Sequence, residues 1–414
     1  MIDFITRHLI PIAFIVVTVL GILIRIPLRD CISNDANKYL LPWYEEILNN
    51  GLSSQVGNYN FPYQLAIFFL TKLPMKPLYA YKLLSCGFDL LLAVICALLV
   101  FDITKKRSHT LLVYCAVLLS PVVILNSAAW AQCDSIFVFF AVCGLYLLLK
   151  DKTFFAMLCF GLSLAFKLQA VFFFPGLMIL YFMRKDFSIG HFLAIPLAMV
   201  VLSLPMIFWG RSLLELVSVY AGQSDTYHYM TVDYPSLYCI FSANDYDVYS
   251  KVAILLTVTA LGALFFWIVY HRIEMTKENT IMLLFLSAFT CVLFLPAMHE
   301  RYGYPYEILA WVLVFLIPKT APLCVGLQLL TLRTYSAYLF GTQINLTMLA
   351  FGNLILYCLY VYLLLKQMQE NVNDTTISTI VDKRSAKFET EQDSKKGHSK
   401  QAIYHKRNRN SFKR

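Results

Sequence analysis

Long apolar runs separated by short charged junctions are the feature that most restricts how this chain can fold. Each of four runs is long enough for the roughly 20 helical residues that cross a bilayer core; they cover residues 9–26, 83–101, 252–270 and 348–365. Only 14% of the 414 residues are charged, whereas a soluble domain carries about 25%. The chain is therefore predicted to be an all-α integral membrane protein.

Basic residues recur at every second junction between the apolar runs, and this pattern predicts the topology. The positive-inside rule places such junctions in the cytoplasm. We therefore expect a polytopic bundle of about 12 transmembrane helices with both termini cytoplasmic. Two middle runs, 154–166 and 170–183, are short, so we expect them to be tilted or to end in a cavity beneath the outer surface. The basic junctions contain Lys105, Lys106 and Arg107, then Lys150 and Lys152, Arg184 and Lys185, Arg272 and Lys277, and Lys319.

The predicted transmembrane domain covers residues 1–366 and has two long external loops, 27–77 and 209–249. In the first loop, apolar and aromatic residues at helical spacing predict an amphipathic helix lying in the plane of the membrane interface. Residues 367–414 hold 11 Lys and Arg against 6 Asp and Glu, and their low apolar content predicts a disordered cytoplasmic tail. We expect the tail to lie along anionic lipids and not to bind nucleic acid. The amphipathic stretch contains Leu40, Trp43, Tyr44, Ile47 and Leu48.

The eleven cysteines do not indicate a disulfide framework or a metal site. Most of them lie within apolar runs, where a buried thiol behaves as a small hydrophobe. Neither a CxxC pair nor an HExxH motif occurs in the sequence, so zinc and redox motifs are not supported. We therefore predict no metal and no cofactor.

Polar residues gather at the predicted outer ends of helices, and ionisable groups at membrane depth indicate function. Asp35, just beyond the first apolar run, could act as general base for an acceptor hydroxyl. It could also cap the N-terminus of the amphipathic helix, and the two roles can coexist. Asp89 is the main ionisable residue expected deep in the membrane. It is not part of a chain of acids that would indicate an ion pathway.

Two further polar groups follow along the chain. Trp130, Gln132 and Asp134 are candidates for donor or acceptor binding; the alternative is an interfacial tryptophan followed by an aspartate that caps the next helix. Lys167 and Gln169 lie between two short apolar runs. The lysine could reach out to the lipid headgroups, or it could offer a cation to a phosphate.

The most specific motif is His299, Glu300 and Arg301, followed by Tyr302. Three adjacent ionisable side chains after an apolar run are hard to explain as packing. Together these groups predict an outward cavity with a carboxylate, cationic Lys, His and Arg side chains, and many aromatics that could stack on sugar faces. Such a cavity suits a donor whose leaving group is a lipid-bound phosphate. The cations would stabilise charge on that phosphate, while the carboxylate deprotonates the acceptor.

These motifs resemble those of the GT-C superfamily of multispan glycosyltransferases, which use polyprenyl-phosphate-linked sugars, and they look like bacterial mannosyltransferase-type members. The similarity covers most of residues 10–365. It is carried by the first-loop acid with Leu-Pro-Trp-Tyr, by Asn-Ser-x-x-Trp-x-Gln-x-Asp at 126–134, by Phe-Lys-Leu-Gln at 166–169 and by Met-His-Glu-Arg-Tyr at 298–302.

The resemblance implies that Asp35 is the catalytic base of an inverting transfer and that residues 299–301 line the donor-phosphate and acceptor site. It also implies that no metal is needed, as is general for members with monosaccharide-phosphate donors. The sequence departs from a common family pattern in having one acid, not an acidic pair, at this place. The nearest other acids are Asp30 and Glu45.

We therefore predict a hexosyltransferase of the cell membrane that moves one sugar from a polyprenyl-phosphate carrier to a glycan, lipid or protein on the extracytoplasmic side. Two alternatives stay open. A transporter or flippase of lipid-linked saccharides would place its charges near the bilayer midplane, and a glycan polymerase would transfer preassembled units. The sequence leaves the sugar, the acceptor and the linkage open.

Overall fold

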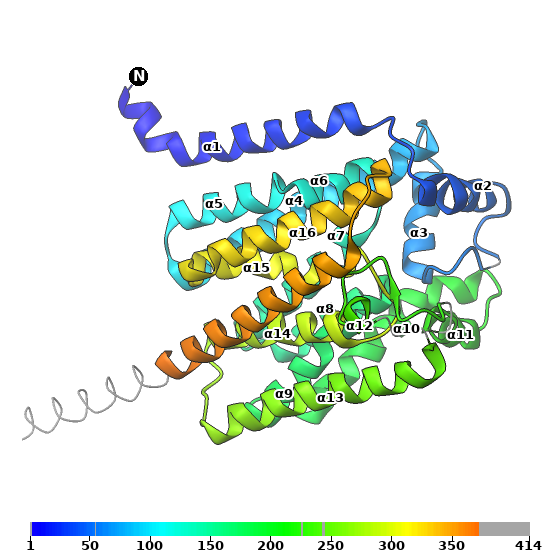
Figure 1. The fold of residues 1–414 in the computed structure, drawn as a ribbon. Coiled ribbons are helices and arrows are strands. Elements are labelled where there is room, and N and C mark those ends of the chain that lie inside the picture. Colours follow the sequence, from blue (N-terminus) through cyan, green and yellow to red (C-terminus); the bar gives the residue numbers. More distant parts are fainter. Residues whose placement is uncertain (1, 54, 225–226, 242–244, 372–414) are drawn as a thin grey trace, which may run out of the picture.

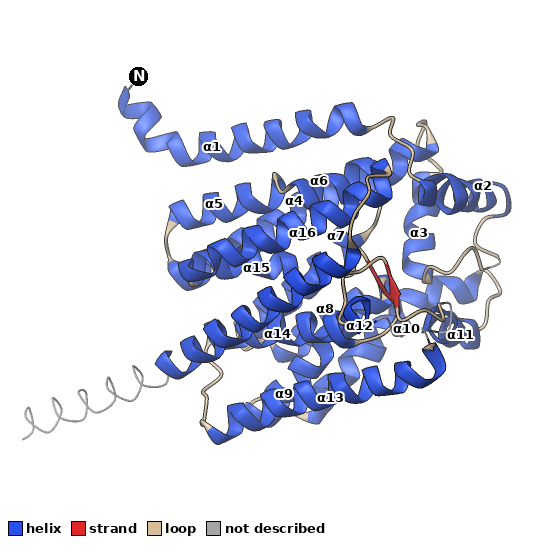
Figure 2. Ribbon diagram, viewed as in Figure 1, coloured by secondary structure: helices blue, strands red, loops and turns tan. Residues whose placement is uncertain are grey.

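The computed structural model describes residues 2–53, 55–224, 227–241 and 245–371, and these are almost entirely helical (Figures 1 and 2). The α-helices are α1 (Ile2–Arg25), α2 (Leu41–Asn50), α3 (Phe61–Leu70), α4 (Pro77–Thr104), α5 (Arg107–Leu118), α6 (Pro121–Ile124), α7 (Asp134–Leu148), α8 (Thr153–Phe166), α9 (Phe174–Met183), α10 (Ala194–Phe208), α11 (Leu213–Ser224), α12 (Tyr238–Phe241), α13 (Tyr246–Tyr270), α14 (Lys277–Phe294), α15 (Tyr304–Leu316), α16 (Ala321–Phe340) and a last helix, Leu346–Asn371. Shorter elements are the 3-10 helices η1 (Ile26–Leu28), η4 (Leu168–Phe173), η5 (Ile189–Leu193) and η6 (Pro318–Thr320), the π-helices η2 (Ala36–Leu40) and η3 (Leu125–Ala129), and the strands β1 (Thr231–Val232) and β2 (Met298–His299).

Several helices in the described part of the chain are suited to crossing a membrane, as expected for an all-α multi-pass protein. Six are long and apolar enough by length and composition, and a bent pair, Arg107–Leu118 with Pro121–Ala129, would make a seventh. Five more apolar helices are shorter, among them Thr153–Phe166 and Leu168–Met183. The predicted total of about twelve spans is therefore not confirmed by this measure. The six long helices are Leu9–Leu28, Pro77–Thr104, Ile189–Phe208, Tyr246–Tyr270, Lys277–Phe294 and Leu346–Asn371.

The helices form a bundle in which α14 is central. Of the 18 residues of α14, 83% are buried within the protein, against 17% of the most apolar 18-residue stretch of α13. The reason is that α14 packs against α9, α13 and α15. A helix that is apolar all round is stable in such a position. On the other side, α4 packs against α5 and α7, and α8 lies between α7 and α10.

The two ends of the bundle differ in chemistry. The described chain ends lie at one end, together with the α4–α5 and α13–α14 connections, whereas α2, α3 and α11 lie at the other (Figure 1), as do the strands, red in Figure 2. At the first end, Asp102 pairs with Lys277 at 2.8 Å, with Lys105 at 3.0 Å and with Lys150. Three of the basic junctions noted in the sequence therefore meet there, at the end of the bundle opposite the two long loops.

The amphipathic segment of the first loop packs mainly onto the protein. It forms η2 and α2, and its residues Leu40, Tyr44 and Ile47 are almost completely buried, while Leu48 is exposed. The buried face contacts α3 and α4. The structure thus gives this face a protein partner, and the predicted position in the membrane interface is not confirmed.

The two long segments predicted to be external loops, 27–77 and 209–249, contact each other at the end of the bundle that carries α2, α3 and α11. Strand β1 of the second loop pairs in parallel with β2, and the Ala297 N–H donates to the Met230 carbonyl at 3.2 Å. Arg211, also from the second loop, is buried and donates to Gln64 of α3 at 3.3 Å and to Gln55. The strand pairing and the Ala297 bond hold the segment that leads into residues 299–302, and the Arg211 bonds join the second loop to the first.

The boundary expected at residue 366 falls inside a helix, because Leu346–Asn371 continues past it. The rest of the predicted tail, residues 372–414, lies outside the described residues.

Candidate active site

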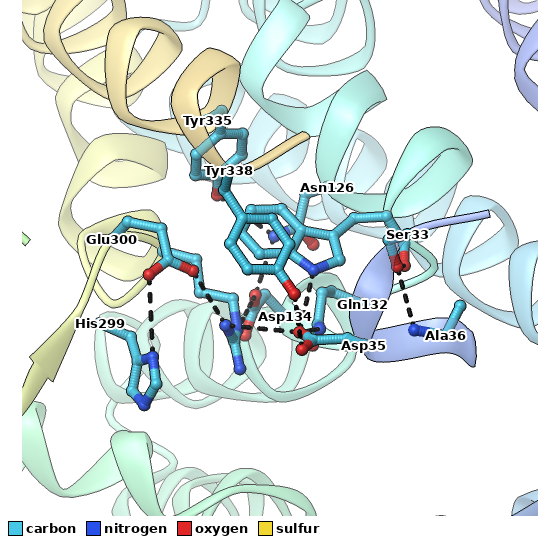
Figure 3. A network of polar contacts seen from close by, with 12 residues as sticks. Ser33, Asp35, Ala36, Asn126, Gln132, Asp134, His299, Glu300, Tyr335 and Tyr338 are labelled. Carbon is cyan, nitrogen blue, oxygen red and sulfur yellow. Dashed lines mark hydrogen bonds and ion pairs between the residues drawn. The ribbon is translucent and has the colours of Figure 1, made fainter. Parts of the chain in front are cut away.

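Asp35 lies at the centre of a polar network between the first loop and three other segments (Figure 3). Its Oδ2 accepts hydrogen bonds from Trp130 Nε1 at 3.0 Å and from Gln132 Nε2 at 2.8 Å. Its Oδ1 accepts one from the Tyr338 hydroxyl at 2.7 Å. The donors come from the η3–α7 turn and from α16, so the carboxylate is held from two sides.

The backbone at Ala131 explains how two neighbouring residues reach the same carboxylate oxygen. Ala131 is buried and has φ +66°, a left-handed conformation that few residues other than glycine adopt. This turn ends η3 and directs Trp130 and Gln132 to Asp35. Such local strain is found mainly where the surrounding structure enforces it, often at functional sites.

Capping is not the role of Asp35. No capping hydrogen bond joins its side chain to the helix backbone. Ser33 instead accepts the Ala36 N–H at 3.1 Å and donates to the Trp130 carbonyl at 3.0 Å (Figure 3). The alternative of an N-cap aspartate is therefore wrong, and the carboxylate is left for the cavity.

Behind Asp35 lies a buried ion pair between Asp134 and Lys167. Asp134 begins α7 and also accepts a hydrogen bond from Asn126 Nδ2 at 2.8 Å. Lys167 is 6% exposed, so it does not extend to the lipid headgroups. Trp130 is completely buried, which excludes the interfacial position considered for it.

Residues 299–302 bring a guanidinium into the same network. Ala297 has φ +59°, and the chain then enters β2. Arg301 Nη1 donates to Glu300 Oε1 at 3.1 Å and lies 3.8 Å from Asp35 Oδ2. The guanidinium carbon is 5.3 Å from the centre of the Trp130 ring, a cation–π distance. Arg301 therefore links residues 299–302 to Asp35 and Trp130.

His299 differs from the expectation of a cationic side chain. Burial, the largest effect, lowers the pKa of His299 below its usual 6.5, although the Glu300 carboxylate, 3.7 Å from Nδ1, opposes the shift. Its ring lies against the rings of Tyr227 at 4.6 Å and Tyr302 at 5.0 Å between centroids. The imidazole is thus favoured in its neutral form at pH 7, as a hydrogen-bonding group and not as a charge.

A cavity of about 750 Å³ opens beside this network. Trp130 and Asp134 lie behind its wall, where they hold Asp35 and Lys167. The other eight predicted site residues line it: Asp35, Gln132, Lys167, Gln169, His299, Glu300, Arg301 and Tyr302.

Several lining residues were not identified from the sequence. Tyr338 is the most important of these, because it bonds directly to Asp35. Tyr39, Trp43, Tyr59 and Tyr227 also line the cavity. In a chain with 26 Tyr and 32 Phe, a single aromatic residue in a helix carries no signal that separates it from packing.

The cavity is not a simple basic pocket. Lys167 and Arg301 face the carboxylates of Asp35, Asp134 and Glu300. Asp233 also lines the cavity, so two cations stand against four carboxylates, a formal excess of two negative charges. Among the described residues, no group of three or more His, Cys, Asp or Glu side chains is arranged to hold a metal ion.

A model of glycosyltransferase family 87 matches residues 59–296. The chain belongs to glycosyltransferase family 87. This is a membrane family of GT-C type, so the resemblance noted in the sequence is confirmed at the level of the superfamily. No curated protein is significantly similar to the chain.

The match to family 87 identifies a membrane glycosyltransferase, and the cavity is its candidate active site. The matched residues include Trp130, Gln132, Asp134, Lys167 and Gln169. The first-loop acid and residues 299–302 lie outside the match. Their assignment to the site rests on the contacts described above.

Proposed function

We propose that this family 87 glycosyltransferase transfers one hexose from a polyprenyl-phosphate carrier to a hydroxyl group, with Asp35 as general base and inversion at the sugar carbon. The observation that carries the proposal is the exposure of Asp35 to the cavity, together with its free hydrogen-bonding capacity. Its side chain is 21% exposed, it lines the cavity, and its Oδ1 accepts a single hydrogen bond from the described residues. A carboxylate oxygen has two lone pairs, so Oδ1 can accept the acceptor hydroxyl as well.

The transfer follows from that contact. Asp35 removes the proton of the acceptor hydroxyl, and the oxygen attacks the anomeric carbon of the donor sugar. The new C–O bond forms as the bond between that carbon and the phosphate oxygen breaks. The electron pair leaves with the polyprenyl phosphate, and the proton stays on Asp35. A single displacement of this kind inverts the configuration at the anomeric carbon.

Lys167 and Arg301 are suited to stabilising the departing phosphate. An ammonium has three N–H donors and a guanidinium has five, and each of these side chains gives one to a carboxylate through a hydrogen bond. Arg301 Nε is buried and lacks a hydrogen-bond partner among the described residues. Charge-assisted bonds from such groups to phosphate are short and strong. His299, if neutral, contributes an N–H without adding charge.

Gln169 is suited to holding a sugar hydroxyl. Its Oε1 is buried, lies in a residue that lines the cavity, and accepts no hydrogen bond from the described residues. A buried acceptor without a donor is costly, so a ligand hydroxyl that bonds to it adds both affinity and orientation.

The proposal includes a topology. The cavity opens at the end of the bundle that carries the external loops, and the lysines around Asp102 gather at the opposite end. With the basic end in the cytoplasm, both chain termini are cytoplasmic and transfer occurs on the extracytoplasmic side of the cell membrane. The bent pair, the shorter apolar helices other than α3, and the 20-residue α16 would complete about twelve spans.

The test uses the protein in nanodiscs with a panel of radiolabelled polyprenyl-phosphate hexoses and a membrane lipid extract. Wild type should release polyprenyl phosphate and form a labelled product from one donor. Asp35→Asn should do neither, whereas Asp30→Asn should match wild type, because Asp30 is an exposed acid outside the cavity. No release from any donor, together with movement of a lipid-linked saccharide across vesicles, would instead support a flippase. Transfer of preassembled units would support a polymerase.

A further inference from the structure

Three aromatic residues form one side of the cavity, next to Asp35. We call Tyr39, Trp43 and Tyr59 the first-loop wall; all three line the cavity. The Trp43 ring lies 5.8 Å from that of Tyr39 and 5.3 Å from that of Tyr59, the latter nearly perpendicular. The wall therefore presents a broad aromatic surface from a single segment of the chain.

Two residues of the wall, Tyr39 and Trp43, lie on the helix that carries the proposed base, whereas Tyr59 lies between α2 and α3. Asp35, Tyr39 and Trp43 are spaced by four residues along η2 and α2. An α-helix repeats every 3.6 residues and a π-helical turn is wider, so a spacing of four keeps the three side chains on one face. From Asp35 to Trp43 the helix rises roughly 12 Å, which is enough for one or two sugar rings beside the base.

Two contacts fix the wall. A Cβ atom at Gly57, where φ is +63°, would lie 2.2 Å from the Trp43 ring. Glycine is therefore needed on both steric and conformational grounds for Trp43 to take this place. The Tyr59 hydroxyl donates to Gln132 Oε1 at 3.2 Å, while Gln132 Nε2 donates to Asp35. The side-chain amide of Gln132 thus connects Tyr59 of the wall to Asp35 and fixes their relative positions.

We infer that the first-loop wall binds a saccharide ring of the acceptor, so that the acceptor is a glycan or glycolipid and not a simple lipid alcohol. The inference rests on the proposed function, in which the hydroxyl next to Asp35 belongs to the acceptor. The cations suited to the donor phosphate, Lys167 and Arg301, come from other segments of the chain. Aromatic rings bind the apolar faces of sugars while their edges and hydroxyls stay polar, and a lipid alcohol has no such face.

Binding can be tested without any donor. Saturation-transfer NMR would follow methyl α-mannoside, methyl β-glucoside and methyl β-galactoside with the protein in nanodiscs, and glycerol would serve as a hydroxyl-bearing ligand without a ring face. Ring protons of at least one glycoside should receive saturation in wild type and in Trp209→Ala, a tryptophan outside the cavity. The signal should be lost in Trp43→Ala and Gly57→Ala and partly kept in Trp43→Phe.

Kinetics with the active donor give the second measurement. Trp43→Ala should raise KM for the acceptor about tenfold and leave KM for the donor unchanged. Equal glycoside signals in Trp43→Ala and wild type, equal signals for glycerol, or a rise in donor KM alone would overturn the wall as an acceptor site. Because the NMR measurement needs no turnover, it tests the wall even if no donor is cleaved, which would count against the proposed function itself.

Discussion

Two aspartates in this protein are each held by several hydrogen bonds, yet they lie in opposite surroundings. Asp35 is 21% exposed and lines a cavity. Asp89, in α4, is completely buried; it pairs with Arg25 at 2.9 Å and accepts a hydrogen bond from Ser127 at 2.5 Å. The partners of Asp35 are mainly neutral, whereas Asp89 has a full cation in direct contact.

The difference separates a carboxylate that a ligand in the cavity can contact from one that holds helices together. Arg25 also donates to the carbonyls of Gly21 and Leu118, so the Asp89 pair ties α1 to α4 and α5. Asp89 has no exposed surface and does not line the cavity, so it is not in a position to contact a substrate there. An ionisable residue in a membrane helix is therefore not sufficient evidence for function, and access to a cavity is the property that distinguishes the two.

The largest effect is expected on activity from Asp35→Asn. Loss of a general base should lower kcat/KM about 10²–10⁴-fold, while the melting temperature stays close to wild type. The asparagine oxygen can still accept from Trp130 and Gln132, and its amide can donate to Tyr338. Steady-state kinetics and thermal unfolding of the same preparation check this; a large loss of stability would mean that Asp35, like Asp89, is structural.

Asp89→Asn should show the reverse pattern. Removing one partner of a buried ion pair leaves an uncompensated charge and costs about 3–5 kcal/mol, so the folded fraction in thermal or denaturant unfolding should fall sharply. Activity per folded molecule should be kept. The double variant Arg25→Met with Asp89→Leu should recover most of the lost stability, because paired apolar replacement removes both charges. Failure to recover would show that the pair has a role beyond packing.

Tyr338→Phe removes one hydrogen bond to Asp35 and should lower kcat/KM about 10- to 150-fold, since bonds to charged groups contribute about 1.5–3 kcal/mol. Tyr335→Phe is the matched control. Tyr335 packs against Trp130 and bonds to Asn126, with no direct bond to Asp35.

Ser127→Ala removes a hydrogen bond to Asp89 and should lower stability while leaving kcat unchanged. Equal kinetic effects of all three substitutions would remove the distinction between the two sites.

The smallest effect concerns His299 and pH. Because burial lowers its pKa in the folded protein, the unfolded chain takes up a proton near pH 6.5 before the folded one does. Its contribution to stability is thus present above pH 6.5 and lost as the pH falls through the lower, folded pKa. The difference between the melting temperatures at pH 7.5 and at pH 5.5 should be smaller in His299→Gln than in wild type. A wild type that gains stability on acidification would contradict this sign.

The sequence predicts the membrane class and most of the polar residues that line the candidate cavity, for a physical reason. Polar groups such as Asp35 and residues 299–301 stand out because burying them in lipid is costly. The same reasoning also marks Asp89, and it cannot tell that residue from a site residue, because the cation that neutralises it, Arg25, is 64 residues away along the chain.

Other features depend on three-dimensional contacts that no local pattern encodes. Tyr338 and Asp35 are separated by 303 residues, and tyrosine is common in this chain. The amphipathic stretch containing Tyr44 has the same pattern whether it packs on lipid or on α3. The neutral state favoured for His299 likewise follows from its burial beside Tyr227 and Tyr302, which adjacency to Glu300 and Arg301 in sequence does not predict.

The central claim is that Asp35 acts as a base, and transfer to azide tests it most directly. Azide is already an anion and needs no deprotonation, so Asp35→Asn should form glycosyl azide from the polyprenyl-phosphate sugar while its transfer to a hydroxyl acceptor stays abolished. Wild type should favour the hydroxyl acceptor. If Asp35→Asn forms neither product while remaining folded, Asp35 does not act as a base for the acceptor, and the account of this site is wrong.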